Sequence, residues 1–164
     1  MNQLYNTIPI TSVARRTITD ITGIAAPEQA GSSISAVCNI AAMVFDGKSI
    51  DSVFMYNPDA IALWLFQKYT TIFDKAFLYS DIQIPMLSIM PSVTPVCFAS
   101  MYTGAMPDVH GIQTYEKPVL KTDTIFDAFL RAGKRPVIIS TANDSISCIF
   151  LNRDMGLVDE ARIR

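Results

Sequence analysis

The sequence predicts an α/β domain with a mainly parallel sheet flanked by helices. Short apolar segments of strand length alternate with longer segments of helical length, as crossover connections between parallel strands require. The segment at 136–141 (PVIIST) is rich in the β-branched residues that favour strands. A chain of 164 residues that is 50% hydrophobic can bury one core. We therefore expect a single domain over 1–164, with a helical lead-in over 1–47 and a strand and helix core over 48–164.

Two helices are predicted in the N-terminal lead-in. The first begins at Thr11 or Ser12 and ends at Thr22, before a glycine that can adopt the left-handed conformation closing a helix. The second covers residues 33–44, and a turn at 46–48 follows it.

A short strand and a longer helix are predicted next. Residues 52–56 (SVFMY) are apolar and of strand length, and the Asn57-Pro58 pair that follows favours a helix N-terminus. This helix is expected to reach about Phe73, with one apolar face and with Trp64 in the core. The residues of that face are Ile61, Leu65 and Tyr69, with Phe66 beside them.

A buried strand at 84–90 (IPMLSIM) is predicted to lead into another helix. Residues 91–92 break the strand, and Thr94 is then placed as the N-cap. Pro95 follows at the first helical position, where a missing N–H costs nothing. The helix is expected to continue to Thr103, before a glycine.

A helix and a strand complete the predicted elements. Thr122 or Asp123 would cap a helix that continues through Ala132, and the 136–141 strand follows a short turn. Ligands of open α/β sheets bind beyond the carboxyl ends of the strands. The loops that qualify cover residues 57–59, 92–94 and 141–144.

Thr94 places a hydroxyl at a helix N-terminus, where unpaired N–H groups and a partial positive charge favour an anion such as a phosphate. A threonine hydroxyl is a poor nucleophile near neutral pH, and a divalent metal ion can activate it. The same residues also suit an ordinary helix cap, because Thr-Pro begins many helices. The residues alone leave both interpretations open.

The segment at 90–112 reads MPSVTPVCFASMYTGAMPDVHGI. It resembles the nucleophile region of the alkaline phosphatase superfamily, in particular its type I phosphodiesterase and nucleotide pyrophosphatase branch. The matching residues are Pro91, Ser92, Thr94, Ser100, Thr103, Gly104, Pro107, His110, Gly111 and Ile112. Two departures are visible: the proline directly follows Thr94 instead of coming one residue later, and Cys97 stands where many relatives have an asparagine of the phosphate site.

The resemblance implies an alkaline phosphatase-like fold and a phosphoric-ester hydrolase whose nucleophile is Thr94. Relatives bind two metal ions, commonly zinc, through Asp and His residues at strand ends. We expect Asp59 and Thr94 to bind metal, and Asn57 and Cys97 to contact the substrate. Asn57 is an imperfect alternative metal ligand, and Asp46 is a third. On the residues alone, Asn57 could equally be a helix N-cap and Asp59 an acid in the first helical turn.

The chain has a single histidine, His110, which the resemblance assigns to the turn after the nucleophile helix and not to the metal. Relatives take their remaining ligands, an Asp-His pair among them, from segments beyond the 136–141 strand, and this sequence has no such pair. We therefore expect the N-terminal portion of a longer enzyme, inactive and self-associating by itself. The alternative is a non-catalytic binding or assembly module derived from the same fold. A phosphomutase or phosphonate hydrolase would share the same partial motif.

Composition narrows the range of partners and compartments. The net charge of −2 and the scattered Lys and Arg residues give no basic patch for nucleic acid. The three cysteines are widely spaced and indicate neither a disulfide framework nor a zinc finger. No window reaches about 18 uninterrupted apolar residues, so we expect a soluble, cytoplasmic protein without a membrane partner. Cys97 lacks the C/S-x-P-x-R pattern of sulfatases.

Overall fold

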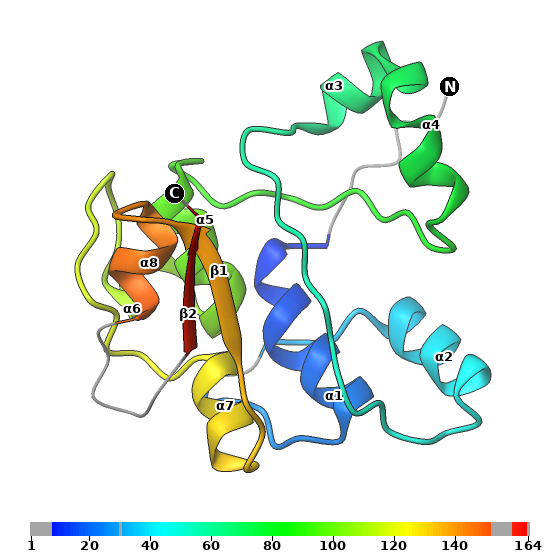
Figure 1. The fold of residues 1–164 in the computed structure, drawn as a ribbon, viewed down its shortest axis with the longest axis horizontal. Helices are drawn as coiled ribbons and strands as arrows, with labels where there is room; N and C mark the ends of the chain where they lie inside the picture. The colour runs from blue at the N-terminus through cyan, green and yellow to red at the C-terminus, as the bar shows by residue number, and fades with distance from the viewer. Residues whose placement is uncertain (1–7, 30, 152–158, 164) are drawn as a thin grey trace.

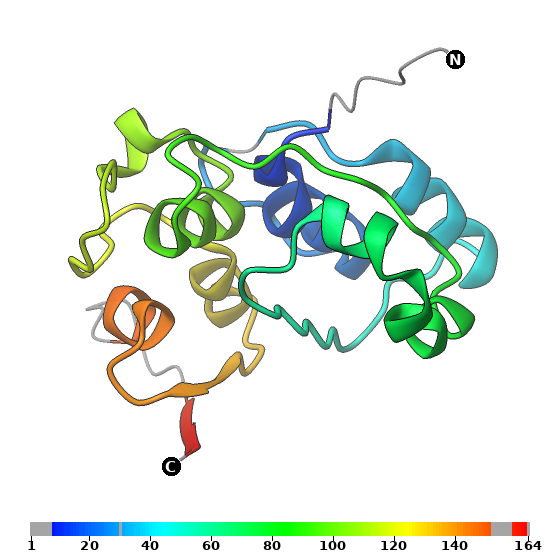
Figure 2. The same ribbon diagram turned by 90° about the horizontal axis from the view of Figure 1, so that it is seen from above.

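Helix α5 (Thr94–Thr103) is the packing centre of the protein. The computed structural model describes residues 8–29, 31–151 and 159–163, with residues 14–16 and 159–163 described as backbone only. Figures 1 and 2 show the N-terminal helical segment on one side of α5, and the last helices and strands of the chain on the other. Contacts join α5 to both groups.

The N-terminal helical segment consists of η1 (Ile10–Ser12), η2 (Val13–Ile18) and α1 (Thr19–Thr22). It ends at Gly23, whose φ of 68° is left-handed. A Cβ on this glycine would lie 2.5 Å from the Ser49 hydroxyl oxygen, so backbone conformation and space both demand glycine. The first predicted helix is confirmed, although its backbone is 3-10 and then π before it becomes α.

Helix α2 (Ser35–Val44) confirms the second predicted helix to within two residues. The turn after it is also confirmed, because Asp46 and Gly47 both have positive φ, at 54° and 69°. The helix contacts α1 and η2. None of its residues is fully buried, and Figure 1 shows it at the edge of the molecule.

The predicted strand at 52–56 is wrong, because this segment pairs with no other strand in the described part of the chain. Phe54 is 87% exposed, whereas the next residue, Met55, packs against the main core. The other residues of the segment are exposed like Phe54, so burial does not alternate along it as in a half-buried strand. The apolar character and strand length of the segment explain the prediction, but a strand also needs a neighbouring backbone.

The helix predicted to follow Asn57-Pro58 begins later and is broken. A turn occupies residues 59–60, and two short helices come after it, α3 (Leu63–Lys68) and α4 (Thr70–Leu78). Neither helix contains a buried residue. Figure 2 shows both helices at a distance from α5, on the side of α2.

Trp64 of α3 is 57% exposed, so its predicted place in the core is wrong. The apolar side chains of α3 and α4 pack against one another instead of against the core. The ring of Phe66 lies 4.0 Å from that of Phe73 and 5.7 Å from that of Phe77, centroid to centroid. The apolar periodicity of this segment therefore reflects the packing of α3 against α4, and not a helix face buried against α5.

The predicted buried strand at 84–90 is also wrong. This segment is extended, and its contact with another backbone is an isolated parallel bridge between Pro9 and Leu87. The Leu87 N–H donates to the Ile8 carbonyl at 2.8 Å, and the Ile10 N–H donates to the Leu87 carbonyl at 3.0 Å. Ile89 is buried. The bridge fixes the chain to the N-terminal helical segment just before α5 begins.

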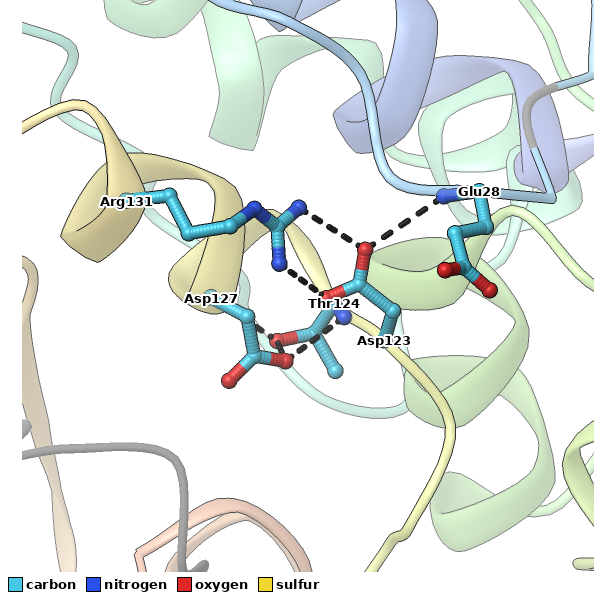
Figure 3. Close-up of polar contacts among 5 residues, drawn as sticks. All are labelled: Glu28, Asp123, Thr124, Asp127 and Arg131. Carbon is cyan, nitrogen blue, oxygen red and sulfur yellow. Dashed lines mark hydrogen bonds and ion pairs between the residues drawn. The ribbon is translucent and has the colours of Figure 1, made fainter.

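Helix α7 (Ile125–Arg131) begins one or two residues later than predicted, because Thr124 is its N-cap. The Thr124 hydroxyl accepts a hydrogen bond from the Asp127 N–H, while the Asp127 carboxylate accepts from the Thr124 N–H at 2.7 Å. Figure 3 shows this capping box beside the bidentate ion pair of Asp123 and Arg131, at 2.6 and 2.8 Å. Asp123 also accepts from the Glu28 N–H, which ties the N-terminal region to α7.

The predicted strand at 136–141 is confirmed as β1 (Val137–Thr141). Helix α8 (Ser145–Phe150) follows, and β2 (Asp159–Ile163) pairs with β1 in parallel. Ile138 of β1 is buried, whereas Val137 and Ile139 on its other face are exposed. The mainly parallel sheet and the alkaline phosphatase-like fold stay predictions, because a single pair of strands tests neither.

The core gathers around the face of α5 that points to α7 and α8. The Tyr102 ring packs against Phe98, Phe126 and Phe150 at centroid distances of 5.8, 4.8 and 5.2 Å. Aromatic pairs at such distances stabilise beyond their buried area. They also fix the rotation of α5 about its axis, and therefore the direction of the side chains in its first turn.

No helix among the described residues has the length and apolar character needed to cross a membrane.

Candidate functional site

The N-terminus of α5 lies where an extended segment turns into a helix. Val93, with φ −115° and ψ 150°, is the N-cap, and Thr94 is the first helical residue. The prediction of Thr94 as the N-cap is therefore off by one residue. No side-chain hydrogen bond caps the helix at Val93, and the Thr94 hydroxyl bonds outside the helix. The hydroxyl points to another segment of the chain instead.

The partner of that hydroxyl is the carboxylate of Asp59. The Thr94 Oγ1 lies 3.3 Å from Asp59 Oδ1 and 3.4 Å from Oδ2, on the exposed side of α5. The Ala60 N–H also donates to Asp59 Oδ1, at 3.0 Å. Asp59 and Thr94 are 35 positions apart in the sequence, and the chain between them returns to bring these two predicted site residues together. Their roles as metal ligands and nucleophile stay predictions.

Asn57 is turned toward the core instead of toward open solvent. Its Nδ2 donates to the Tyr102 hydroxyl at 2.7 Å. The alternative interpretation of Asn57 as a helix N-cap is wrong, since Ala62 is the N-cap of α3, and Asp59 accordingly lies outside a first helical turn. Burial raises the pKa of Tyr102 to about 12, so this hydroxyl stays protonated at neutral pH.

Cys97, the other residue predicted to contact substrate, lies in the first turn of α5 beside two serines. Its Sγ is 3.4 Å from the Ser88 hydroxyl oxygen and 4.0 Å from that of Ser92. The two serine hydroxyl oxygens are 2.6 Å apart. Sequence reasoning missed Ser88, because it lies inside the segment predicted as a buried strand. Cys97 is a free thiol, and its contact with substrate stays a prediction.

Two further acids lie apart from this pair. Asp46 is at the exit of α2, and its carboxylate lies 4.0 Å from Lys48 on the exposed surface. Asp144, in the predicted 141–144 loop, is the N-cap of α8 and accepts from the Ser147 N–H at 2.7 Å and from the Ser140 hydroxyl. Of the three predicted ligand loops, the structure joins the first two through Asp59 and Thr94.

His110 closes helix α6 (Pro107–His110) and is buried. Its Nδ1 accepts from the Ile112 N–H at 3.2 Å, so the proton is on Nε2, which lies 2.9 Å from the Ser100 hydroxyl oxygen. Burial lowers the pKa of His110 and favours this neutral form. The geometry agrees with the structural role that the sequence resemblance implies.

Much of the sequence motif has a structural purpose of the same kind. Gly104 and Gly111, which end α5 and α6, have φ of 71° and 82°. The Thr103 hydroxyl donates to the Ala99 carbonyl at 2.7 Å and accepts from the Ala105 N–H at 3.0 Å. These contacts fold the turn after α5 back on the helix and leave Thr94 at its free end.

The oxygen atoms of Asp59 and Thr94 suit a divalent cation in chemistry and spacing. Two oxygen ligands of a tetrahedral zinc ion, each at about 2.0–2.2 Å, are about 3.3–3.6 Å apart. The separations of 3.3 and 3.4 Å fall in this range. In the described part of the chain, no group of three or more His, Cys, Asp or Glu residues could hold a metal ion. The pair alone is not a complete set of metal ligands, and its binding of a metal ion stays a prediction.

The comparison with known protein families assigns this region. Residues 59–138 match the sequence model of a family in the alkaline phosphatase superfamily. The description of that family is type I phosphodiesterase / nucleotide pyrophosphatase. The match begins at Asp59 and includes Thr94 and Cys97. Comparisons with curated proteins and with solved structures found no significant match.

This assignment carries a general chemistry. The family is one of phosphodiesterase and pyrophosphatase-type hydrolases, and it implies phosphate-ester substrates.

Proposed function

We propose that the chain is the nucleophile-bearing part of a metal-dependent phosphoric-ester hydrolase in which Thr94 attacks phosphorus. The observation that carries the proposal is the contact of the Thr94 hydroxyl with the Asp59 carboxylate, at 3.3 Å, at the N-terminus of α5. Both residues lie within the segment that matches the phosphodiesterase family.

The proposed reaction proceeds in two displacements. The Thr94 oxygen loses its proton and forms a bond to phosphorus, while the bond from phosphorus to the leaving oxygen breaks and that oxygen takes up a proton. Water then attacks the phosphorus of the phosphothreonine, the bond from phosphorus to the Thr94 oxygen breaks, the phosphate product is released, and the Thr94 oxygen takes up a proton. The ten-residue helix α5 favours the negative charge that gathers on the phosphoryl oxygens in front of its N-terminus. Cys97 and the serine hydroxyls beside it would border the substrate.

Divalent metal ions, two zinc ions in our proposal, would supply Lewis acidity that lowers the pKa of the hydroxyl when they are bound. Asp59 and Thr94 would hold one of them. A two-metal site needs more ligands than this pair provides, and we propose that a further segment of a longer protein contributes them. The 164-residue chain by itself would then have little or no turnover. A phosphomutase or phosphonate hydrolase would use the same two residues.

NMR of the 164-residue chain, with the threonine methyl groups labelled, tests the metal and anion chemistry without requiring turnover. Zn²⁺ is added first and inorganic phosphate second, and the Thr94 signal is followed. We expect Zn²⁺ to shift it, phosphate to shift it further, and Asp59→Ala to remove both responses. Asp46→Ala is the matched control, because that exposed acid lies at the exit of α2 and should leave both responses intact. A Thr94 methyl signal whose chemical shift changes with neither Zn²⁺ nor phosphate would contradict the proposal.

A second candidate function is a non-catalytic binding or assembly module. The observation that favours it is the amount of exposed apolar surface on α3, α4 and β1, where Trp64, Ile72 and Ile139 are all accessible. Surface of this kind marks interaction sites, and we expect it to make the chain self-associate. Analytical ultracentrifugation over a range of concentrations separates the two: assembly without a Thr94 response to Zn²⁺ favours the module.

A further inference from the structure

The Asp59 carboxylate is exposed, and an exposed side chain in a turn has no fixed direction unless its backbone is held. The hydrogen bond from the Ala60 N–H orients the carboxylate within the turn. It does not fix the turn relative to α5. Some other contact must do so for the carboxylate to face Thr94.

That contact lies two residues earlier, at Asn57. Its amide donates to the Tyr102 hydroxyl at 2.7 Å, a short distance for a neutral N–H···O bond. Tyr102 is only 6% exposed, and its ring is held by Phe98, Phe126 and Phe150. The acceptor oxygen therefore belongs to a side chain packed in the core, on the same helix that carries Thr94.

The chain between the anchor and the carboxylate is short and stiff. Asn57 precedes a proline, which restricts its backbone to extended conformations. Pro58 has a fixed φ, and Asp59 follows directly. A side chain held at Asn57 therefore determines where the next two residues lie. Met55, which packs against the core, holds the segment on the other side.

We propose that the Asn57–Tyr102 hydrogen bond is a positioning clamp that holds the Asp59 carboxylate against the Thr94 hydroxyl. Asn57 and Tyr102 are then positioning residues, and Asn57 acts through Asp59 instead of contacting the substrate. The importance of the clamp for phosphate-ester chemistry rests on the proposed function. The positioning itself does not.

The test uses the 164-residue chain with labelled threonine methyl groups, observed by NMR. Asp59→Ala defines the Thr94 signal without its carboxylate partner. We expect Asn57→Ala and Tyr102→Phe each to change the Thr94 chemical shift by more than half of the difference between the unchanged chain and Asp59→Ala. Tyr79→Phe is the matched control, because the Tyr79 side chain is 84% exposed and its hydroxyl should be dispensable. The methyl signal of Thr124 in the α7 capping box reports that each variant is folded.

A conservative exchange separates positioning from general structural damage. Asn57→Asp keeps the shape, and its carboxylate can accept a hydrogen bond from the Tyr102 hydroxyl. We expect Asn57→Asp to retain the native Thr94 signal in the presence of Tyr102 and to lose it when combined with Tyr102→Phe. A native Thr94 signal in folded Asn57→Ala and Tyr102→Phe would overturn the clamp.

A Zn²⁺ titration of the same samples connects the clamp to the proposed function. Residues that orient a metal ligand alter metal affinity by about 10–100-fold when they are replaced. We expect the midpoint of the Thr94 response to rise about 10-fold in Tyr102→Phe. If zinc binds with an equal midpoint in Tyr102→Phe and the unchanged chain, the importance of the clamp for the proposed function is overturned. The absence of any zinc response in the unchanged chain would contradict the proposed function, and the methyl shifts would still decide the clamp.

Discussion

The Nε2 of His110 lies 2.9 Å from the hydroxyl oxygen of Ser100, and both residues are buried. The bond joins the end of α6 to the middle of α5, so a buried hydrogen bond holds the two helices together across the turn between them. It also explains why two polar residues of the sequence motif occur where the core would otherwise be apolar: each satisfies the other.

The first prediction concerns the Ser100 hydroxyl. Ser100→Ala leaves the buried N–H of His110 without an acceptor, which costs about 1–3 kcal/mol of unfolding free energy. Urea unfolding followed by circular dichroism measures the loss. Ser88→Ala is the control, since that hydroxyl lies on the exposed side near Cys97 and should change stability by about 0.5 kcal/mol or less. Equal effects at the two positions would contradict the buried pair.

The second prediction concerns pH. The folded protein holds His110 with a lowered pKa because of burial, so the unfolded chain binds the proton more readily. Its contribution to stability is therefore complete above the ordinary histidine pKa of about 6.5 and is lost progressively as the pH falls below it. We expect the urea concentration at the unfolding midpoint to decrease as the pH is lowered from 7 to 5.5.

His110 is the only histidine in the sequence, so the effect can be assigned to one residue. His110→Gln is less stable than the unchanged protein at pH 7, but its midpoint should vary much less over the same pH interval. If both proteins showed the same slope, His110 would not be the titrating group.

The third prediction concerns the start of α7. Thr124→Ala removes the capping hydroxyl and should reduce the unfolding free energy by about 0.5–2 kcal/mol. Thr122→Ala, at a position that the sequence alone favoured as a cap, should have an effect within about 0.5 kcal/mol. The same urea measurement compares the two. A larger loss of unfolding free energy in Thr122→Ala than in Thr124→Ala would favour Thr122 as the N-cap, as the sequence predicted.

The fourth prediction compares two large aromatic residues. Phe150 is fully buried and packs against Tyr102 and Phe126, so Phe150→Ala should cost about 3–5 kcal/mol. Trp64→Ala should cost much less than that, because Trp64 is largely exposed on α3. Thermal unfolding of the two variants tests the difference. A comparable loss in Trp64→Ala would mean that α3 packs on the core after all.

Local sequence was sufficient to predict features that depend on the backbone conformation of a few neighbouring residues. Gly23, Gly104 and Gly133 all have positive φ, and each lies where a helix was predicted to end. The β-branched segment became β1, and the motif around Thr94 was enough to predict a family that residues 59–138 match. These features depend on the conformations of individual residues or on a linear pattern, and both can be read from the order of the amino acids.

Features that need a distant partner were decided by the tertiary structure. Residues 52–56 form an apolar run of strand length but have no strand to pair with among the described residues, and Trp64 has helical spacing but lies outside the core. The same holds for the candidate site. Sequence placed Asp59 and Thr94 in separate loops, and only the folded chain brings their oxygen atoms within 3.3 Å. The physical reason is that strand pairing, burial and a two-residue site are properties of two segments at once, and no single segment specifies where the other will lie.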